Sequence, residues 1–400
     1  MRILSATVRG FRNLQESTFE FSPRVNLVLG RNGEGKTNLL EALNYYALGR
    51  SHRGARIDDL LGFDSDSAFV QLEIESKPGD VMRCEYAFER GKGNRFFLDG
   101  EVVGRRADLV GVLNTVYFDP ESIRLVRGEP SRRRHFVDQG VSESEPLYLS
   151  HLTAFQRTLK QKNGLLRDLK RGFADYSSAR EELRAWNREL AHHAVEICLG
   201  RDDYARRLTP CADNAQRALT GGDCGLEFVY RPALGTVRSQ LAAEVPENDS
   251  DDPILSPLSF CEKAQLEGDI LGEFDYIMES EIKRGRTLGG PQFDDFEMRQ
   301  DGLDLRVFGS QGESRAAAIS LILARSDVLY LKRRIRPVIF FDDIFSELDS
   351  QRGHRLQEMA SGLHQVFIAT ARPGDVAGWE PPEMKTWSVR DGRFDETESP

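Results

Sequence analysis

Cysteine is scarce in this sequence, and the few cysteines that occur form no C-x-x-C pair. An odd number of isolated cysteines in a chain of 400 residues argues against a disulfide framework and against a cysteine metal site. It indicates a reducing compartment. We expect small, buried thiols at the five positions Cys84, Cys198, Cys211, Cys224 and Cys261.

The sequence also lacks long hydrophobic runs and an excess of positive charge. No segment approaches the roughly 18 uncharged apolar residues of a membrane-spanning helix, and the first thirty residues carry charges where an export signal would be apolar. Acidic residues outnumber basic ones, 64 against 54, so the net charge is −10. Any contact with nucleic acid therefore requires a local basic patch. We expect a soluble, cytoplasmic protein without membrane contacts.

The composition is that of a folded protein, with 40% hydrophobic and 30% charged residues, which excludes disorder. The N-terminal third mixes strand and helix patterns. Apolar residues alternate from Ile3 to Phe21, a continuous apolar strand runs from Val25 to Leu29, and a helix pattern ends at Gly49. Asp99-Gly100 between two apolar runs predicts a hairpin.

The middle of the chain has a different pattern. Strand signals are rare from His151 to Pro210, where Leu183, Leu190 and Ile197 recur every seven residues. Two heptads are too few for a long coiled coil, so this pattern predicts a short antiparallel helical arm. The acidic stretch from Glu244 to Pro253 is expected to be an exposed loop.

The α/β pattern returns near the C-terminus, with apolar strands at Pro337 to Phe341 and Gln365 to Ala369. Two α/β segments that flank a helical insertion favour one discontinuous domain over two sequential domains. We expect an α/β head formed by residues 1–125 and 295–400, with an inserted, mainly helical lobe at residues 126–294.

A phosphate-binding pattern follows the first apolar strand directly and opens a helix, which is the context that G-x-x-x-x-G-K-[ST] requires. The pattern consists of Gly30, Arg31, Asn32, Gly33, Glu34, Gly35, Lys36 and Thr37. The glycines let backbone N–H groups curl around phosphates, and Lys36 reaches the β- and γ-phosphates. The Thr37 hydroxyl is expected to coordinate Mg²⁺. The motif predicts ATP and Mg²⁺ as cofactors.

Two carboxylates, Asp342 and Asp343, follow four apolar residues of a predicted buried strand. In a phosphoryl-transfer site this position is close to the metal and the attacking water. We expect Asp342 to hold the metal and Asp343 to act in catalysis by orienting or deprotonating the water. Two acids after a strand are also a common helix cap, but the phosphate loop in the same chain favours the catalytic interpretation.

The tetrad Ser310-Gln311-Gly312-Glu313 stands before a helix pattern from Ser314 to Leu331. Ser310 is either a simple N-cap or part of an S-x-G-x signature. The order of phosphate loop, insertion, signature and paired acids resembles that of an ATP-binding cassette (ABC-type) head. The resemblance implies that Ser310, Gln311 and Gly312 of one subunit complete the catalytic γ-phosphate site of another. An ATP-dependent homodimer would follow.

Seven motifs resemble, in order, those of the RecF family of bacterial recombination and repair ATPases: GFRN, GRNGEGKT, FDPESIRLVRGEPSRRRHFVD, GPQFDD, GSQGESR, DDIFSELD and QVFIAT. The resemblance implies a weak, DNA-stimulated ATPase that dimerises on ATP and binds DNA at gaps or stalled forks. It further implies support of recombinase loading and the SOS response, and a RecR-type mediator as partner. In the wider SMC-like group the arginine that matches Arg12 approaches the nucleotide phosphates.

Three motifs depart from the family pattern. The family's GPHRDD reads GPQFDD here, at residues 290–295, and its SQGQQR reads SQGESR, so Glu313 adds a negative charge near the expected phosphate site. Thr370 stands where many cassette ATPases have a switch histidine.

Basic residues that would contact DNA are expected in clusters, most of them in the insertion. Such contacts would reach phosphates, without reading the bases, and would be sensitive to salt. Each cluster is also consistent with a merely solvated face. The candidates are Arg132, Arg133, Arg134, Lys160, Lys162, Lys170 and Arg171; Arg124, Arg127 and the run from Lys332 to Arg336 are further ones.

The alternative function is a structural, SMC-like head whose ATP cycle only tethers DNA. A much longer heptad insertion would favour that function, and the sequence has none. The large insertion between Thr37 and Ser310 argues against the nucleotide-binding subunit of a transporter. Too few residues follow Asp343 for a fused nuclease domain.

Overall fold

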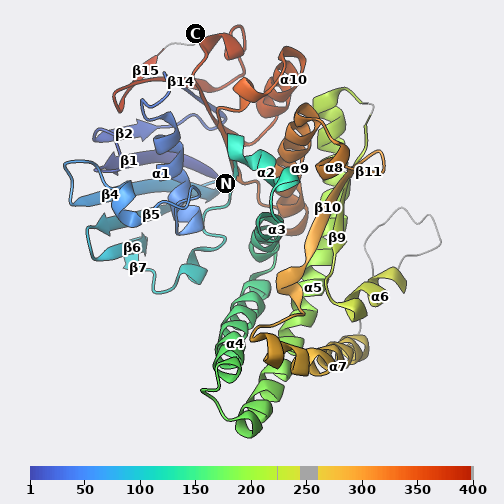
Figure 1. The fold of residues 1–400 in the computed structure, drawn as a ribbon. Coiled ribbons are helices and arrows are strands. Elements are labelled where there is room, and N and C mark those ends of the chain that lie inside the picture. Colours follow the sequence, from blue (N-terminus) through green and yellow to red (C-terminus); the bar gives the residue numbers. More distant parts are fainter. Residues whose placement is uncertain (223, 244–259, 398–400) are drawn as a thin grey trace. The chain divides into compact units, whose positions relative to one another are not determined.

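The computed structural model describes residues 1–222, 224–243 and 260–397, and the chain forms two compact units (Figure 1). The head unit comprises Met1–Ile123, Asn214–Gly225 and Ser310–Pro400, and the helical unit comprises Arg124–Asp213 and Leu226–Gly309. The expected acidic loop from Glu244 to Pro253 lies outside the described residues.

These units differ from the division expected at residues 125/126 and 294/295. Residues 295–309 pack with the helical unit, because the strand that begins at Asp295 pairs with the strand Leu226–Arg231. The short segment Asn214–Gly225, from the middle of the chain, belongs to the head unit. Strand pairing, which sequence patterns do not report, decides the first assignment. Hydrogen bonds from Ser320 to Gln216 and from Arg355 to the Leu219 carbonyl oxygen support the second.

One sheet of the head unit is antiparallel, in the order β2-β1-β4-β5-β6-β7. Its strands are β1 (Arg2–Arg9), β2 (Ser17–Glu20), β4 (Ser67–Lys77), β5 (Asp80–Glu89), β6 (Gly93–Leu98) and β7 (Glu101–Val102). Asp99 and Gly100 join β6 to β7 with φ angles of 50° and 85°. Positive φ at both positions is what a tight hairpin turn between right-twisted strands requires, so the predicted hairpin is confirmed.

The second sheet of the head unit has the order β15-β14-β3-β13-β12-β8, with every neighbouring pair parallel except β14 and β15. Its strands are β3 (Val25–Leu29), β8 (Thr115–Phe118), β12 (Val338–Asp342), β13 (Gln365–Thr370), β14 (Met384–Arg390) and β15 (Arg393–Thr397). Every residue of β12 and β13 is buried, as expected for parallel strands covered on both faces. The carboxyl ends of β3, β12 and β13 therefore meet at one edge of the sheet.

Three longer helices complete the head unit: α1 (Lys36–Leu48), α9 (Gln311–Arg333) and α10 (Ser350–Ser361). Helix α1 packs against β8, β12 and β13 of one sheet and against β5 of the other, which explains why its buried residues lie on all sides. It ends at Gly49 in the left-handed conformation, as predicted. Short 3₁₀ turns are η1 (Ile57–Leu60), η2 (Arg106–Leu109), η3 (Pro120–Ile123), η5 (Ile344–Glu347) and η6 (Pro373–Val376).

The helical unit contains a three-helix arm and a small sheet. Its elements are α2 (Arg124–Arg127), α3 (Pro130–Ser144), α4 (Pro146–Lys170), α5 (Tyr176–Thr220), β9 (Leu226–Arg231), α6 (Gly235–Ala243), α7 (Phe260–Arg284), η4 (Pro291–Phe293), β10 (Asp295–Gln300), β11 (Leu303–Asp304) and α8 (Leu305–Phe308). Leu166 of α4, Leu183 of α5 and Met278 of α7 share one apolar cluster. Leu190 and Ile197 are also buried, so the heptad positions do face a core.

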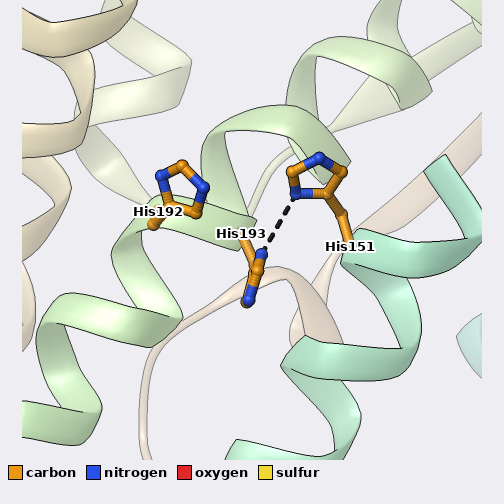
Figure 2. Close-up of side chains that lie close together, drawn as sticks. All are labelled: His151, His192 and His193. Atoms are coloured by element: carbon orange, nitrogen blue, oxygen red, sulfur yellow. Dashed lines mark hydrogen bonds between the residues drawn. The ribbon is translucent and has the colours of Figure 1, made fainter. Parts of the chain in front are cut away.

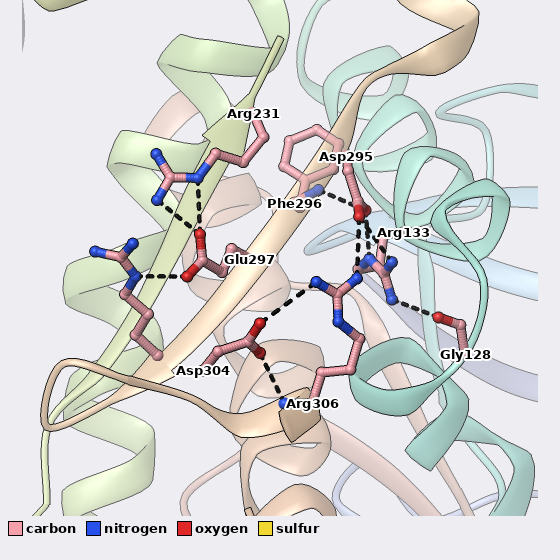
Figure 3. A network of polar contacts seen from close by, with 9 residues as sticks. Gly128, Arg133, Arg231, Asp295, Phe296, Glu297, Asp304 and Arg306 are labelled. Atoms are coloured by element: carbon pink, nitrogen blue, oxygen red, sulfur yellow. Dashed lines mark hydrogen bonds and ion pairs between the residues drawn. The ribbon is translucent and has the colours of Figure 1, made fainter. Parts of the chain in front are cut away.

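The two acids of GPQFDD organise the ion pairs of the helical unit. Asp294 is fully buried and accepts hydrogen bonds from Arg201 Nη1 at 2.7 Å and from the Ala233 N–H at 2.8 Å. Asp295 pairs with Arg133 at 2.6 Å and with Arg306 at 3.4 Å (Figure 3). The carboxylates of Asp294 and Asp295 therefore hold α3, α5 and β10 together.

The five cysteines are free thiols. Cys84 and Cys198 are buried as expected, whereas Cys261 is exposed. Among the described residues, no helix is long and apolar enough to cross a membrane.

Candidate nucleotide-binding site

The phosphate-binding loop connects β3 to α1 and requires glycine at three positions. A side chain at Gly30 would meet Val389 Cγ1 at 2.4 Å and the Val389 carbonyl oxygen at 2.7 Å. Gly33 and Gly35 have φ angles of 87° and 123°, which L side chains rarely adopt. The loop is thus folded tightly against β14 by residues that the motif places there.

Lys36, the first residue of α1, is only 5% exposed. Its ammonium group donates to the carbonyl oxygens of Gly30 at 2.6 Å and Arg31 at 2.9 Å, so it is held inside the loop. Burial lowers the pKa of Lys36, and the carboxylates of Asp343 and Asp342 act in the opposite direction. The nearby acids keep a buried cation where an anionic phosphate would be bound.

The two residues expected to hold a metal meet in the structure. Thr37 Oγ1 donates to Asp342 Oδ1 at 3.0 Å, although 305 positions separate them. Tyr117 donates to the other carboxylate oxygen at 3.1 Å. A hydroxyl beside a carboxylate is an all-oxygen donor set of the kind that Mg²⁺ prefers. The residues present therefore fit a magnesium ion.

Burial raises the pKa of Asp342 to about 6, and the neighbouring carboxylates of Asp119 and Asp343 act in the same direction. The hydrogen bonds from Thr37 and Tyr117 lower this pKa but only in part offset the burial. Without a cation this carboxylate is costly to ionise at neutral pH. A divalent ion would remove that cost.

Replacing Asp342 by Asn is therefore expected to stabilise the nucleotide-free protein at neutral pH and to abolish magnesium-dependent hydrolysis. The pKa rises from its ordinary value of 3.8 to about 6 on folding. A shift of about 2 units corresponds to at most about 3 kcal/mol. Because the folded state binds the proton more tightly, the wild type pays this cost fully above pH 6 and not at all below pH 3.8.

Thermal melts of both proteins between about pH 4 and pH 7.5 measure this difference, which should shrink as the pH falls through the two pKa values. Asp64→Asn is the matched control, because Asp64 is an exposed acid of the same unit and should not change the melting temperature. If the Asp342→Asn variant were less stable than the wild type at the higher pH, burial of the ionised Asp342 carboxylate would not be destabilising, and the expectation would be wrong.

Asp343 follows Asp342 in the left-handed conformation, with a φ angle of 53°. Its N–H donates to the Ala369 carbonyl oxygen at 2.9 Å, which fixes the end of β12 beside β13. Its Oδ1 atom is buried and has no hydrogen-bond partner among the described residues. An unsatisfied carboxylate oxygen at this edge is available to accept a hydrogen bond from a water molecule.

The segment that contains Arg12 contacts the loop through the next residue. Asn13 Nδ2 donates to the Gly33 carbonyl oxygen at 3.2 Å, and Asn13 Oδ1 accepts from Asn38 Nδ2 at 2.7 Å. The Arg12 guanidinium forms an ion pair at 2.7 Å with Glu41, a fully buried residue of α1. Sequence reasoning missed Asn13, although its place beside Arg12 in GFRN was a usable signal.

Sequence patterns also did not predict the pair of His52 and Tyr117, which lies next to Asp342. The rings of His52 and Tyr117 are 4.0 Å apart, centre to centre, and Tyr117 reaches Asp342 as described above. Burial, with the nearby Arg53 and Arg12, lowers the pKa of His52 to about 3, so this ring is neutral. No motif pointed to these aromatic residues, because only the fold brings them to Asp342.

Ser310 begins α9 and forms a capping box. Its hydroxyl accepts from the Glu313 N–H at 3.2 Å, and the Glu313 carboxylate accepts from the Ser310 N–H at 2.7 Å. These hydrogen bonds, together with Arg352, lower the pKa of Glu313. The negative charge that Glu313 adds to the signature therefore accepts a hydrogen bond within the capping box. Ser310 and Gln311 remain exposed at the start of the helix.

Two of the basic residues proposed to contact DNA are buried instead. Arg133 is 1% exposed and pairs with Asp295, and Lys162 is 1% exposed and pairs with the buried Glu281 at 2.7 Å. Successive helical residues point about 100° apart, so a run of basic residues cannot share one face. Arg133 and Lys162 are removed from the candidates, because breaking such pairs leaves an uncompensated buried charge.

The other candidates of the helical unit keep access to solvent. Arg134 is half-buried and donates to the Asp294 carbonyl oxygen at 2.7 Å. The exposed ones are Arg124, Arg127, Arg132, Lys160, Lys170 and Arg171.

The parallel sheet, the phosphate-binding loop at its edge and the acids that end β12 are those of an ABC-type P-loop ATPase head of α/β class. The family model of the RecF/RecN/SMC N-terminal domain matches residues 2–381 of this sequence. The chain belongs to this family and, within it, to the RecF proteins, which are DNA replication and repair proteins.

Two curated relatives bear the name DNA replication and repair protein RecF. The protein of Exiguobacterium sp. (strain ATCC BAA-1283 / AT1b) is 30% identical over 399 residues, covering 100% of both chains. The protein of Ligilactobacillus salivarius (strain UCC118) is 29% identical over 392 residues, covering 98% of this chain and 97% of its own.

Solved structures agree with this assignment. A structure described as the recombination mediator protein RecF-ATPrS in the RecFOR pathway has a TM-score of 0.84 at 26% identity, covering 99% of this chain and 98% of its own. An Smc head domain from Pyrococcus furiosus, at 16% identity and a TM-score of 0.56, shares the fold and covers 99% of this chain and 95% of its own.

Proposed function

We propose that this chain is an ATP-dependent, DNA-binding factor of recombinational repair and replication restart. It binds Mg-ATP, dimerises on ATP and hydrolyses it slowly, faster in the presence of DNA. The observation that carries the proposal is the meeting of Thr37 with Asp342 beside the phosphate-binding loop. These two residues are far apart in the sequence, and their meeting beside the loop supports a nucleotide site.

Each residue of the site then has one task. The backbone of the loop and the Lys36 ammonium bind the β- and γ-phosphates of the substrate, and Thr37 and Asp342 hold Mg²⁺. The metal supplies charge neutralisation of the phosphates. Asp343 orients the attacking water through its unpartnered oxygen and accepts its proton. Arg12, held by Glu41 of α1, adds positive charge near the phosphates.

Ser310, Gln311 and Gly312 contact the γ-phosphate held by a second copy of the chain. Two observations support this role: Ser310 and Gln311 are exposed, and they begin a long helix whose N-terminus attracts anions. The partners that follow are double-stranded or gapped DNA, bound without regard to sequence, and a mediator of the RecR type. Loading of recombinase at gaps or stalled forks, and support of the SOS response, would be the outcome.

The mass of the protein in solution tests this proposal. Alone and with Mg-ADP we expect a monomer, because the signature contacts require a γ-phosphate. With Mg-ATP or a slowly hydrolysed analogue we expect a dimer, since a ligand that binds the dimer more tightly than the monomer shifts the association equilibrium by mass action. Sedimentation velocity measures this change. A dimer mass both with and without ATP would argue for a permanent assembly, and a monomer mass in both conditions would contradict ATP-dependent dimerisation.

DNA binding is expected to depend on phosphate contacts made by exposed residues of the arm. The double variant Lys160→Ala/Arg171→Ala should lower the slope of log affinity against log salt concentration by about 0.9 per lost contact on duplex DNA. Duplexes of unrelated sequence should bind alike. Fluorescence anisotropy over a salt series measures both.

The control for this experiment is Lys92→Ala, which removes an exposed lysine of the head unit. An unchanged salt slope in the double variant would remove these two residues from the DNA surface. Arg133→Ala is not a usable variant, because it breaks the buried pair with Asp295.

A further inference from the structure

Three histidines of the helical unit come together on the surface of the arm (Figure 2). His151 lies near the start of α4, and His192 and His193 lie in the middle of α5. One ring nitrogen from each lies within 4.8 Å of the others. The chain has only seven histidines, and nothing in the nucleotide site uses these three.

We infer that His151, His192 and His193 bind a divalent transition-metal ion of the zinc class. Imidazole nitrogen is a preferred ligand of Zn²⁺, Ni²⁺ and Cu²⁺, and three such ligands suffice for a site that keeps a further position for water or a carboxylate. Mg²⁺ prefers oxygen ligands, so this site is chemically distinct from the one at Thr37 and Asp342.

The geometry is close to that of a metal site. His151 Nδ1 and His193 Nδ1 are 3.1 Å apart and form a hydrogen bond between the two rings. Ligands of a tetrahedral zinc ion, at about 2.0–2.1 Å from the metal, stand about 3.3–3.4 Å apart, so this pair needs to open only slightly. The side chain of His192 is 55% exposed, and its ring has to move toward the pair to complete the site.

A carboxylate supports the third ligand. Glu267 of α7 lies with Oε2 at 3.1 Å from His192 Nδ1, which leaves Nε2 of the same ring for a metal. Metal-bound histidines commonly donate their second ring N–H to a carboxylate, which orients the ring and raises its basicity. Glu267 is therefore a positioning residue of the site, and it adds negative charge beside the ion.

The proposed ligands come from two helices, His151 from α4 and His192 and His193 from α5. The supporting carboxylate, Glu267, comes from a third helix, α7. An ion held here would join α4 to α5 directly and α7 through Glu267, and so stiffen the three-helix arm.

Calorimetric titration of untagged, EDTA-treated full-length protein with ZnCl₂, in excess Mg²⁺, tests the inference. We expect one equivalent of Zn²⁺ to bind, and Co²⁺ in its place to give the visible absorption of a low-coordinate nitrogen site. His151→Asn and His193→Asn should each weaken Zn²⁺ binding tenfold or more, and Glu267→Gln should weaken it about tenfold. Zn²⁺ should also raise the melting temperature of the wild type and not of the histidine variants.

The controls are His354→Asn, which removes an exposed histidine of the head unit, and Cys261→Ser, which removes the exposed thiol of α7; both should bind Zn²⁺ like the wild type. Circular dichroism in EDTA checks that each variant is folded. If a histidine variant does not fold, Glu267→Gln tests the site in its place. Wild-type Zn²⁺ affinity in the folded His151→Asn or Glu267→Gln variant would overturn the inference, as would the absence of a stoichiometric equivalent in the wild type.

Discussion

Asp343→Asn is expected to slow ATP hydrolysis about 100- to 1,000-fold while ATP affinity stays close to that of the wild type. The substitution preserves the shape of the side chain but removes the charge that orients and deprotonates water. The buried Oδ1 of Asp343 has no partner among the described residues, so its loss disrupts no other hydrogen bond. Because hydrolysis ends the dimeric state, the ATP-bound dimer of this variant should also last longer.

Lys36→Ala is the matched contrast, because Lys36 acts on the bound substrate and Asp343 on water. This variant should lose most of its ATP affinity, since the ammonium group held in the loop supplies ground-state charge for the phosphates. Equilibrium dialysis measures the affinity, and single-turnover kinetics measures the chemical step. Equal ATP affinity for wild type and Lys36→Ala would contradict the assignment of the loop.

Ser310→Arg is expected to abolish ATP-induced dimerisation while each chain remains folded and binds ATP. The exposed start of α9 is the proposed contact with the nucleotide of the second subunit, and an arginine there would insert bulk into that contact. The cost to folding is small, because loss of the cap to Glu313 removes only about 1 kcal/mol. Sedimentation with Mg-ATP, beside thermal melts, separates association from stability.

Asp304→Ala provides the control for this variant. Asp304 caps α8 by accepting from the Arg306 N–H at 2.8 Å, so its loss also removes an N-cap, but one in the helical unit. This control should dimerise on ATP like the wild type. If Ser310→Arg still dimerises, or if it loses its fold together with its dimer, the composite site between two subunits has to be abandoned.

Much of the head was predictable because its signals are local. Periodicity and turn residues report on a few neighbouring positions, and they placed the strand Val25–Leu29, the helix end at Gly49 and the turn at Asp99-Gly100. The phosphate-binding loop was equally accessible, since its function requires glycines at fixed spacing in one contiguous segment. Order along the chain then allowed the paired acids to be assigned to the same site.

Contacts between distant segments were not predictable in the same way. The bond from Thr37 to Asp342 was inferred from motifs, but the support of Asp342 by Tyr117 had no pattern of its own. It depends on the pairing of β8 with β12 in the sheet. The bond from Asn13 to Gly33 depends on how the segment after β1 lies against the loop. The assignment of residues 295–309 to the helical unit depends on strand pairing too.

The sequence by itself determined the class of fold and the residues able to bind phosphate, because both follow from local spacing of residue types. Only the tertiary structure decided which charged side chains face solvent. Arg132, Arg133 and Arg134 are the same residue type at successive positions, so the sequence does not distinguish them. In the structure Arg133 is buried against Asp295, while Arg132 is exposed. Likewise His151 and His193 are 42 positions apart and meet only because α4 and α5 pack together. Burial and long-range pairing are properties of the folded chain, in which desolvation has to be balanced by a partner that no local pattern specifies.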